Sequence, residues 1–304
     1  MTAPDPTRPP LVVQPVNSPH APAQSDQADR NPATPNNGPL TEPLAPIPSE
    51  GQLAQPPYRR AVVPWTFVDI FAGLGVVLLA SLLISAVLEF GSWDGGPGRL
   101  LIGSLPIWIG LLGTAVWACR RHGSGLVRDL GLHFKWIDLA IGLGAGLGLR
   151  LVIGIWAVLY NQITGQSPQG NLQPILGDGL GTGIFLVINV LVISVIGPVV
   201  EEIFFRGLGL RSALASLWRR ADRKRFADPR RRAWYAAGMT SALFAALHLS
   251  EVTDLGSAVV LLPGLFMAGW VLARLTLWSG RLGPAILTHV VFNGSAVLAL
   301  LALQ

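Results

Sequence analysis

Long apolar runs, separated by short polar or glycine-rich connections, make up the chain from about residue 60 onward. A helix needs about 20 residues to cross roughly 30 Å of hydrocarbon, and several of the runs approach or exceed that length. The pattern predicts an all-α fold, a polytopic transmembrane helical bundle of about seven spans. The predicted spans are about 66–89, 100–119, 137–160, 183–206, 233–249, 257–275 and 283–301.

Residues 1 to about 58 differ from the rest, because they hold most of the 24 prolines and no large apolar cluster. Such a segment cannot bury enough surface to offset its conformational entropy, so we expect a disordered, proline-rich tail. It lacks the charged start and apolar core of a secretory signal, which predicts a cytoplasmic tail. A docking arm for a proline-binding partner is the alternative. Residues 59–304 are then the transmembrane domain.

Composition agrees with a membrane protein, since 51% of the 304 residues are hydrophobic and only 13% are charged. A water-soluble chain of this length rarely has such a balance. The net charge of +5 does not predict nucleic-acid binding, because the arginines gather in a few loops between apolar runs. A single cysteine, Cys119, excludes a disulfide within the chain.

The basic loops predict a topology through the positive-inside rule. With seven spans the connections at 90–99, 161–182 and 250–256, which are poor in Lys and Arg, all fall on one side. The amino terminus is then cytoplasmic and the carboxyl terminus outside, in a cell membrane that we take to be the plasma membrane. The basic segments on the cytoplasmic side are 59–60, 120–135, 211–232 and 274–281.

The third predicted span contains alternate glycines and one arginine. The glycines give two overlapping pairs with small-xxx-small spacing, which let a second helix approach closely; they are Gly142 with Gly146 and Gly144 with Gly148. Arg150 follows in the same apolar run. We expect it to pair with Asp69 or with a backbone carbonyl, or else to contact a substrate carboxylate.

The stretch VVEEIFFRG ends the fourth predicted span with two carboxylates and an arginine. A charge inside hydrocarbon costs about 3 kcal/mol or more, so such residues are functional candidates that point into the bundle. Glu202 and Arg206 are four residues apart and share a helix face, which predicts an ion pair, whereas Glu201 faces elsewhere. Pro198 removes a backbone hydrogen bond and predicts a kink. A cytoplasmic helix end is the alternative explanation for the two glutamates.

Two later spans carry further polar groups. Phe244 and His248 share one helix face in the fifth span, and His289 and Asn293 lie one turn apart near the start of the seventh. Each histidine alone is as compatible with a structural hydrogen bond as with catalysis. Together, the three helices supply groups suited to activating water or stabilising an oxyanion.

Three phrases of the chain resemble the signature of the CPBP family, which comprises CAAX prenyl endopeptidases and bacteriocin-processing or Abi proteins. They occur in the family's order over about residues 180–300. The resemblance does not include the proline-rich tail and extends to the first three spans only in general character. The phrases are EExxxR (Glu201, Glu202, Arg206), FxxxH (Phe244, His248) and HxxxN (His289, Asn293).

This resemblance implies an intramembrane, glutamate-dependent endopeptidase that acts on membrane-associated, prenylated or leader-peptide substrates. Glu201 would activate the attacking water with His248. His289 and Asn293 would bind the substrate carbonyl oxygen, and Arg206 would orient Glu202.

Members of the family are often labelled metalloproteases, and Glu201, His248 and His289 would be the ligands if a divalent metal such as zinc is bound. The usual HExxH spacing is absent, so water activated without a metal is the equal alternative. Two other functions stay open. One is a non-proteolytic membrane immunity or scaffold protein, and the other is a proton-coupled transporter that uses Glu201 and the histidines as a relay. The predicted partners are the lipid bilayer and a peptide or protein substrate.

Overall fold

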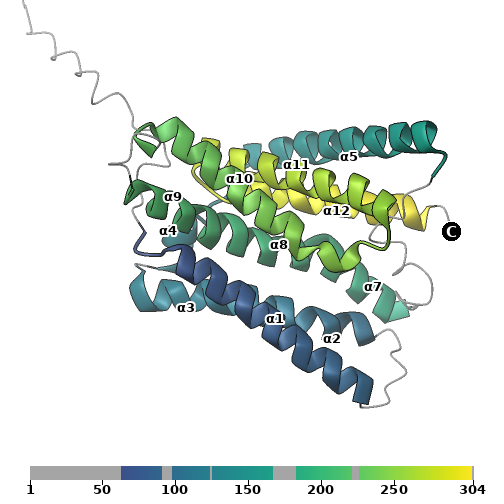
Figure 1. The fold of residues 1–304 in the computed structure, drawn as a ribbon, viewed down its shortest axis with the longest axis horizontal. Helices are drawn as coiled ribbons and strands as arrows, with labels where there is room; N and C mark the ends of the chain where they lie inside the picture. Colours follow the sequence, from purple (N-terminus) through teal and green to yellow (C-terminus); the bar gives the residue numbers. More distant parts are fainter. Residues whose placement is uncertain (1–62, 91–97, 124, 167–182, 221–225, 303–304) are drawn as a thin grey trace, which may run out of the picture. The chain divides into compact units, whose positions relative to one another are not determined.

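The computed structural model describes residues 63–90, 98–123, 125–166, 183–220 and 226–302 (Figure 1). The chain divides into two units, Met1–Pro48 and Ser49–Gln304, and all the described residues belong to the second. The predicted disordered tail lies outside them. Every regular element within the described ranges is a helix, so this part of the chain is all-α.

Five stretches of helix are long and apolar enough to cross a membrane, and all five lie where the apolar runs predicted spans. Two of these stretches are single regular helices at the edge of the bundle, α1 and α5, and α11 is a third regular helix. The other two contain π-helical turns, where each N–H donates to the carbonyl five residues earlier. The bounds are α1 Phe67–Phe90; α2 Gly98–Ile107, η2 Trp108–Leu112 and α3 Gly113–His122; α5 Ile137–Thr164; α7 Gly183–Leu191, η3 Val192–Ile196, α8 Gly197–Glu202, η4 Ile203–Gly209 and α9 Leu210–Trp218; and α11 Leu255–Ser279.

The two remaining predicted spans are also helices, but they do not meet the same criterion. Helix α12 (Gly283–Leu301) is apolar over a shorter stretch, and α10 (Pro229–Leu247) begins with three arginines and is rich in alanine. Five of the seven predicted spans therefore qualify by this measure among the described residues, and the other two stay a prediction. Both α10 and α12 nevertheless pack against α11 (Figure 1).

Helix α10 begins earlier than the apolar pattern predicted. The Asp228 side chain accepts a hydrogen bond from the backbone N–H of Arg230, and Pro229 occupies the first helical position. Both residues favour a helix start there, because an acidic cap satisfies a free N–H and proline needs none. The earlier start moves the arginine-rich segment into the helix and leaves His248 at the opposite end.

The fourth span departs from the regular α-helical hydrogen-bond pattern on both sides of the two glutamates. The π-helical turn η3 comes before α8, and the longer π-helical stretch η4 comes after it. Gly197 and Pro198 open α8, so the predicted disturbance at Pro198 takes the form of a π turn. Turns of this kind are rare and occur frequently at functional sites.

Helix α5 packs closely on α12 through one of the two predicted glycine pairs. A Cβ atom on Gly142 would lie 2.5 Å from the Leu287 Cβ, and one on Gly146 would lie 2.7 Å from the Val291 Cβ. Only glycine permits this approach. The second pair, Gly144 and Gly148, has nothing within 4 Å of either position, so that part of the prediction was wrong.

The core surrounds η4. Phe204, Phe205 and Leu208 are fully buried, and the rings of Phe204 and Phe205 meet edge to face with centroids 5.2 Å apart. Helix α1 reaches this core through Gly73, where a Cβ atom would lie 2.5 Å from the Phe204 ring. The apolar packing therefore encloses the helix that carries the charged residues.

Candidate active site

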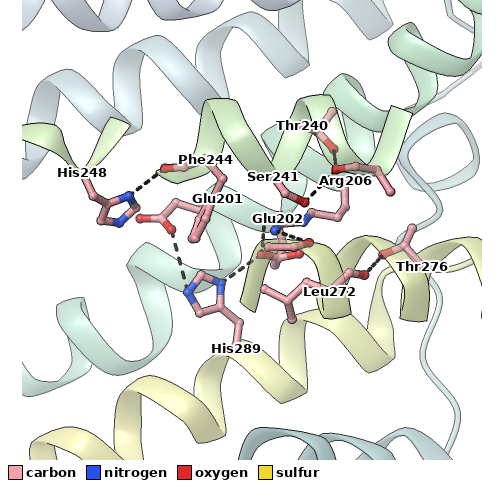
Figure 2. Close-up of polar contacts among 12 residues, drawn as sticks. Glu201, Glu202, Arg206, Thr240, Ser241, Phe244, His248, Leu272, Thr276 and His289 are labelled. Atoms are coloured by element: carbon pink, nitrogen blue, oxygen red, sulfur yellow. Dashed lines mark hydrogen bonds and ion pairs between the residues drawn. The ribbon is translucent and has the colours of Figure 1, made fainter. Parts of the chain in front are cut away.

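Two adjacent glutamates at the end of α8 have different surroundings (Figure 2). The side chain of Glu202 is fully buried, whereas that of Glu201 is 15% exposed. Neighbouring residues on a helix diverge by about 100°, so the two carboxylates face different parts of the bundle. Glu202 is held inside, whereas part of the Glu201 side chain stays accessible.

Arg206 compensates the buried charge of Glu202, as the spacing predicted. Its Nη1 lies 2.8 Å from the Glu202 Oε1, and its Nη2 donates to the backbone carbonyl of Gly269 at 3.0 Å. The guanidinium carbon lies 4.7 Å from the centroid of the Phe244 ring. A fully buried arginine needs such partners, because its charge has lost its water.

Gly269 on α11 is a residue that the sequence reading missed. A Cβ atom there would lie 3.1 Å from Ser241 and 3.2 Å from the Nη2 of Arg206. The absence of a side chain lets the guanidinium lie directly against the α11 backbone. No motif distinguishes this glycine from others in apolar helices.

His289 joins α12 to both glutamates. Its Nδ1 lies 2.9 Å from the Glu202 Oε1, and its Nε2 lies 3.8 Å from the Glu201 Oε2. Because a carboxylate only accepts, Nδ1 donates its hydrogen to Glu202, which directs the Nε2 edge toward Glu201. The Glu202 Oε1 thus receives hydrogen bonds from Arg206 and His289 together.

His248 ends α10 and enters the same neighbourhood. Its Nδ1 donates to the Phe244 carbonyl at 2.8 Å, which leaves Nε2 as the acceptor in the neutral ring. The Phe244 ring centroid lies 4.9 Å from that of His248 and 5.7 Å from that of His289. The Phe244 ring therefore contacts both imidazoles, and Figure 2 shows the Glu201 carboxylate between the two imidazoles in that view.

Asn293 lies one turn beyond His289 on α12, but its recorded bond leads elsewhere. The Nδ2 donates to the backbone carbonyl of Ile193 in η3 at 3.2 Å. The structure thus brings Glu201, Glu202, Arg206, His248 and His289 together and ties Asn293 to the turn before the glutamates.

Residues 183–295 match the family model described as Type II CAAX prenyl endopeptidase Rce1-like. This part of the chain belongs to the Rce1-like family. The family is one of CAAX-type intramembrane endopeptidases, and all three predicted motifs lie within the matched residues. The match does not extend to α1 through α5. No curated protein and no solved structure matches the chain.

The donor atoms of the Rce1-like domain do not fit a metal centre. Within the described ranges, no group of three or more His, Cys, Asp or Glu side chains is arranged to hold a metal ion. Glu201, His248 and His289 would be the ligands if a metal is bound, but they do not form such a group in this arrangement, where one His289 nitrogen is engaged by Glu202.

Arg150 lies outside the matched residues but contacts the Rce1-like domain. Its Nη2 donates to the Phe292 carbonyl at 2.6 Å, and its guanidinium carbon lies 4.2 Å from the Phe292 ring centroid. Of the expected partners, the carbonyl is the one observed, since Asp69 instead accepts from the Thr66 N–H. Arg150 therefore fastens α5 to α12 beside the site.

Proposed function

We propose that this protein is an intramembrane endopeptidase in which Glu201 is the general base. The observation that carries the proposal is the meeting of three helices. Glu201 on α8 lies 3.8 Å from His289 on α12, and the ring of Phe244 on α10 contacts both His289 and His248. Polar groups are costly inside an apolar bundle, so residues of this kind that meet there are functional candidates.

In this mechanism, Glu201 and the Nε2 of His248 bind one water molecule from two sides. The water oxygen attacks the carbonyl carbon of the scissile bond while its proton passes to Glu201. The oxyanion then collapses, the C–N bond breaks, and Glu201 returns the proton to the leaving amine. Both groups suit these roles, because Glu201 is partly exposed and the neutral His248 ring presents an acceptor.

His289 has the role of stabilising the oxyanion when it carries a proton on both nitrogens. Its Nδ1–H then stays on Glu202 and its Nε2–H points toward the reacting carbonyl oxygen. Arg206 and the buried Glu202 are the positioning pair behind it. The position of His289 supports this assignment, since its Nδ1 lies 2.9 Å from Glu202 and its Nε2 lies 3.8 Å from Glu201.

We also propose that α10 and α12 cross the bilayer with the five longer helices, with the amino terminus in the cytoplasm. Contacts between helix ends support one basic face. The Trp65 indole donates to Ala118, Arg219 donates to Trp65, and Arg232 stacks 4.4 Å from the Trp218 ring. The ends that join here are rich in Arg and Trp, as is typical of a cytoplasmic membrane interface.

The proposed substrates are membrane-associated peptides or proteins, including prenylated proteins and leader peptides. Replacement of Glu201 by Gln tests the proposal, because the amide keeps the shape but cannot take the proton. Loss of a general base costs about 10²- to 10⁴-fold in rate. New peptide termini that appear in membranes of cells with the intact protein, and not with Glu201→Gln, would identify substrates for assay with the purified protein.

The matched control is Glu89→Gln, which removes an exposed carboxylate from the end of α1 and should leave cleavage unchanged. Full cleavage by Glu201→Gln would refute the assigned base. Proton-coupled uptake into liposomes without any cleavage would favour the transporter, and neither activity would favour a scaffold.

A further inference from the structure

The start of α8 contains a proline where the hydrogen-bond pattern of the preceding π turn requires a backbone donor. In η3 the Gly197 N–H donates to the Val192 carbonyl, five residues earlier. The next donor in this register is residue 198, and its acceptor is the Ile193 carbonyl. Residue 198 is proline, which has no N–H, so the Ile193 carbonyl receives no bond from its own helix in this register.

Asn293 supplies the missing donor from another helix. Its Nδ2 lies 3.2 Å from the Ile193 carbonyl oxygen, although the two residues are 100 positions apart. A carboxamide N–H is chemically equivalent to a backbone N–H, so it restores the bond that the proline removes. Inside a bilayer such a replacement matters more than in water, because no solvent can reach an orphaned carbonyl.

The bond between Asn293 and Ile193 joins two segments that also carry residues of the candidate active site. Pro198 is buried and precedes Glu201 by three residues within the six residues of α8. Asn293 follows His289 by one turn on α12. The continuous stretch of η3 and α8 is therefore joined to α12 twice, once through Ile193 in η3 and once through the Glu202–His289 bond. Two separated attachments limit rotation of α8 about its axis, which one attachment alone does not.

From this arrangement we infer that Asn293 is a positioning residue. Its amide replaces the hydrogen-bond donor that Pro198 lacks and so holds the π turn that directs Glu201 toward His289. The inference rests on the proposed function for the role of Glu201. It differs from the role implied by the family resemblance, in which Asn293 binds the substrate carbonyl oxygen.

The test restores the backbone donor and asks whether Asn293 is still needed. Pro198→Ala provides an N–H at residue 198, so Asn293→Ala should be costly in the native background and nearly harmless in the Pro198→Ala background. Thermal unfolding of the four purified full-length proteins in one detergent measures this coupling. A lower unfolding midpoint for Asn293→Ala that Pro198→Ala reverses supports the inference, and strictly additive effects overturn it. This readout does not require any enzymatic activity.

Cleavage kinetics separate positioning from direct catalysis. For a positioning role, Asn293→Ala should lower kcat roughly tenfold with little change in KM, as for loss of one hydrogen bond to a buried group. Adding Pro198→Ala should return most of kcat. If Asn293 instead binds the reacting oxygen, the double variant stays as slow as Asn293→Ala, and the inference fails. Absence of cleavage by the native protein would count against the proposed function and leave the unfolding cycle to decide.

Two further variants serve as a substitute for Asn293→Ala and as a control. Asn293→Leu keeps the approximate size without a donor or a charge, so it should show the same reversal by Pro198→Ala if Asn293→Ala folds poorly. Ser295→Ala is the matched control, because the Ser295 hydroxyl also donates to a backbone carbonyl, that of Phe292, at 2.9 Å. That carbonyl has no relation to Pro198. The effects of Ser295→Ala and Pro198→Ala should therefore add, and a coupling as large as that of Asn293 would contradict the inference.

Discussion

Helices α1 and α11 are nearly equal in length, 24 and 25 residues, yet they are used differently. In the most apolar 18-residue window of α1, 17% of the residues are buried, against 44% in α11. Most of the α1 side chains are apolar and exposed. Helix α11 is more buried, and its Gly269 carbonyl accepts a hydrogen bond from Arg206. The apolar length of a helix therefore indicates that it fits a bilayer, whereas its burial indicates whether it can contact a charged residue inside the bundle.

The largest expected effect comes from removing the interior cation. Arg206→Met should destabilise the protein by about 3–5 kcal/mol, because it leaves Glu202 buried with its charge uncompensated. Arg121→Met removes an exposed arginine stacked on Trp117 and should cost about 1 kcal/mol or less. Thermal or chemical unfolding in detergent measures both. Equal losses would mean that the interior ion pair contributes no more than a surface contact.

A smaller difference is expected between two glycines. Gly269→Ala places a methyl group against Ser241 and the Arg206 guanidinium, so it should cost about 1–3 kcal/mol and reduce cleavage. Gly144→Ala meets open space within a helix and should be neutral or stabilising by up to about 1 kcal/mol. Unfolding midpoints and cleavage rates of the two variants, measured side by side, check this. If Gly269→Ala has no effect, the contact of Arg206 with α11 does not require a residue without a side chain at position 269.

The contact of α5 with α12 can be tested in the same way. Gly146→Ala would bring a Cβ atom to 2.7 Å from the Val291 Cβ, whereas Gly148→Ala has nothing within 4 Å. We expect a loss of about 1–2 kcal/mol for Gly146→Ala, since the peripheral α5 can move outward to relieve part of the overlap. No loss is expected for Gly148→Ala. Identical behaviour of the two variants would show that the glycine face does not set the helix spacing.

The smallest effect concerns pH at the exposed start of α11. The pKa of Asp254 lies below its ordinary value because the carboxylate accepts hydrogen bonds from the Ser257 N–H and the Thr253 hydroxyl. A carboxyl whose pKa falls on folding stabilises the native state above its unfolded pKa, and this contribution disappears as the pH drops through the folded pKa. Unfolding curves of the native protein and Asp254→Asn should differ slightly at neutral pH and converge below about pH 4. A difference that persists in acid would exclude this carboxylate as its source.

Much of the fold follows from apolar length, and less of the site does. The seven predicted spans all coincide with helices because the runs are long and bounded by basic or glycine-rich connections. The Glu202–Arg206 pair was predictable because both partners lie on one helix face. The bond from His289 to Glu202 was not, since the partners are 87 residues apart and helix periodicity carries no information about packing between helices. The crossing of α10 stays a prediction, because this helix begins with arginines and is rich in alanine and so falls short of the apolar length that marks the other spans.

The π-helical stretch η4, Ile203–Gly209, also gives the fourth span room to lose a residue. A π turn holds more residues than an α turn, so loss of one residue from this stretch favours ordinary α geometry and leaves the helix continuous. The lost residue is the extra one that the π turn holds, so α9, with its arginine-rich end, would keep roughly its native orientation relative to Glu201. The same deletion within the regular helix α9 would instead rotate every residue beyond it by about 100°.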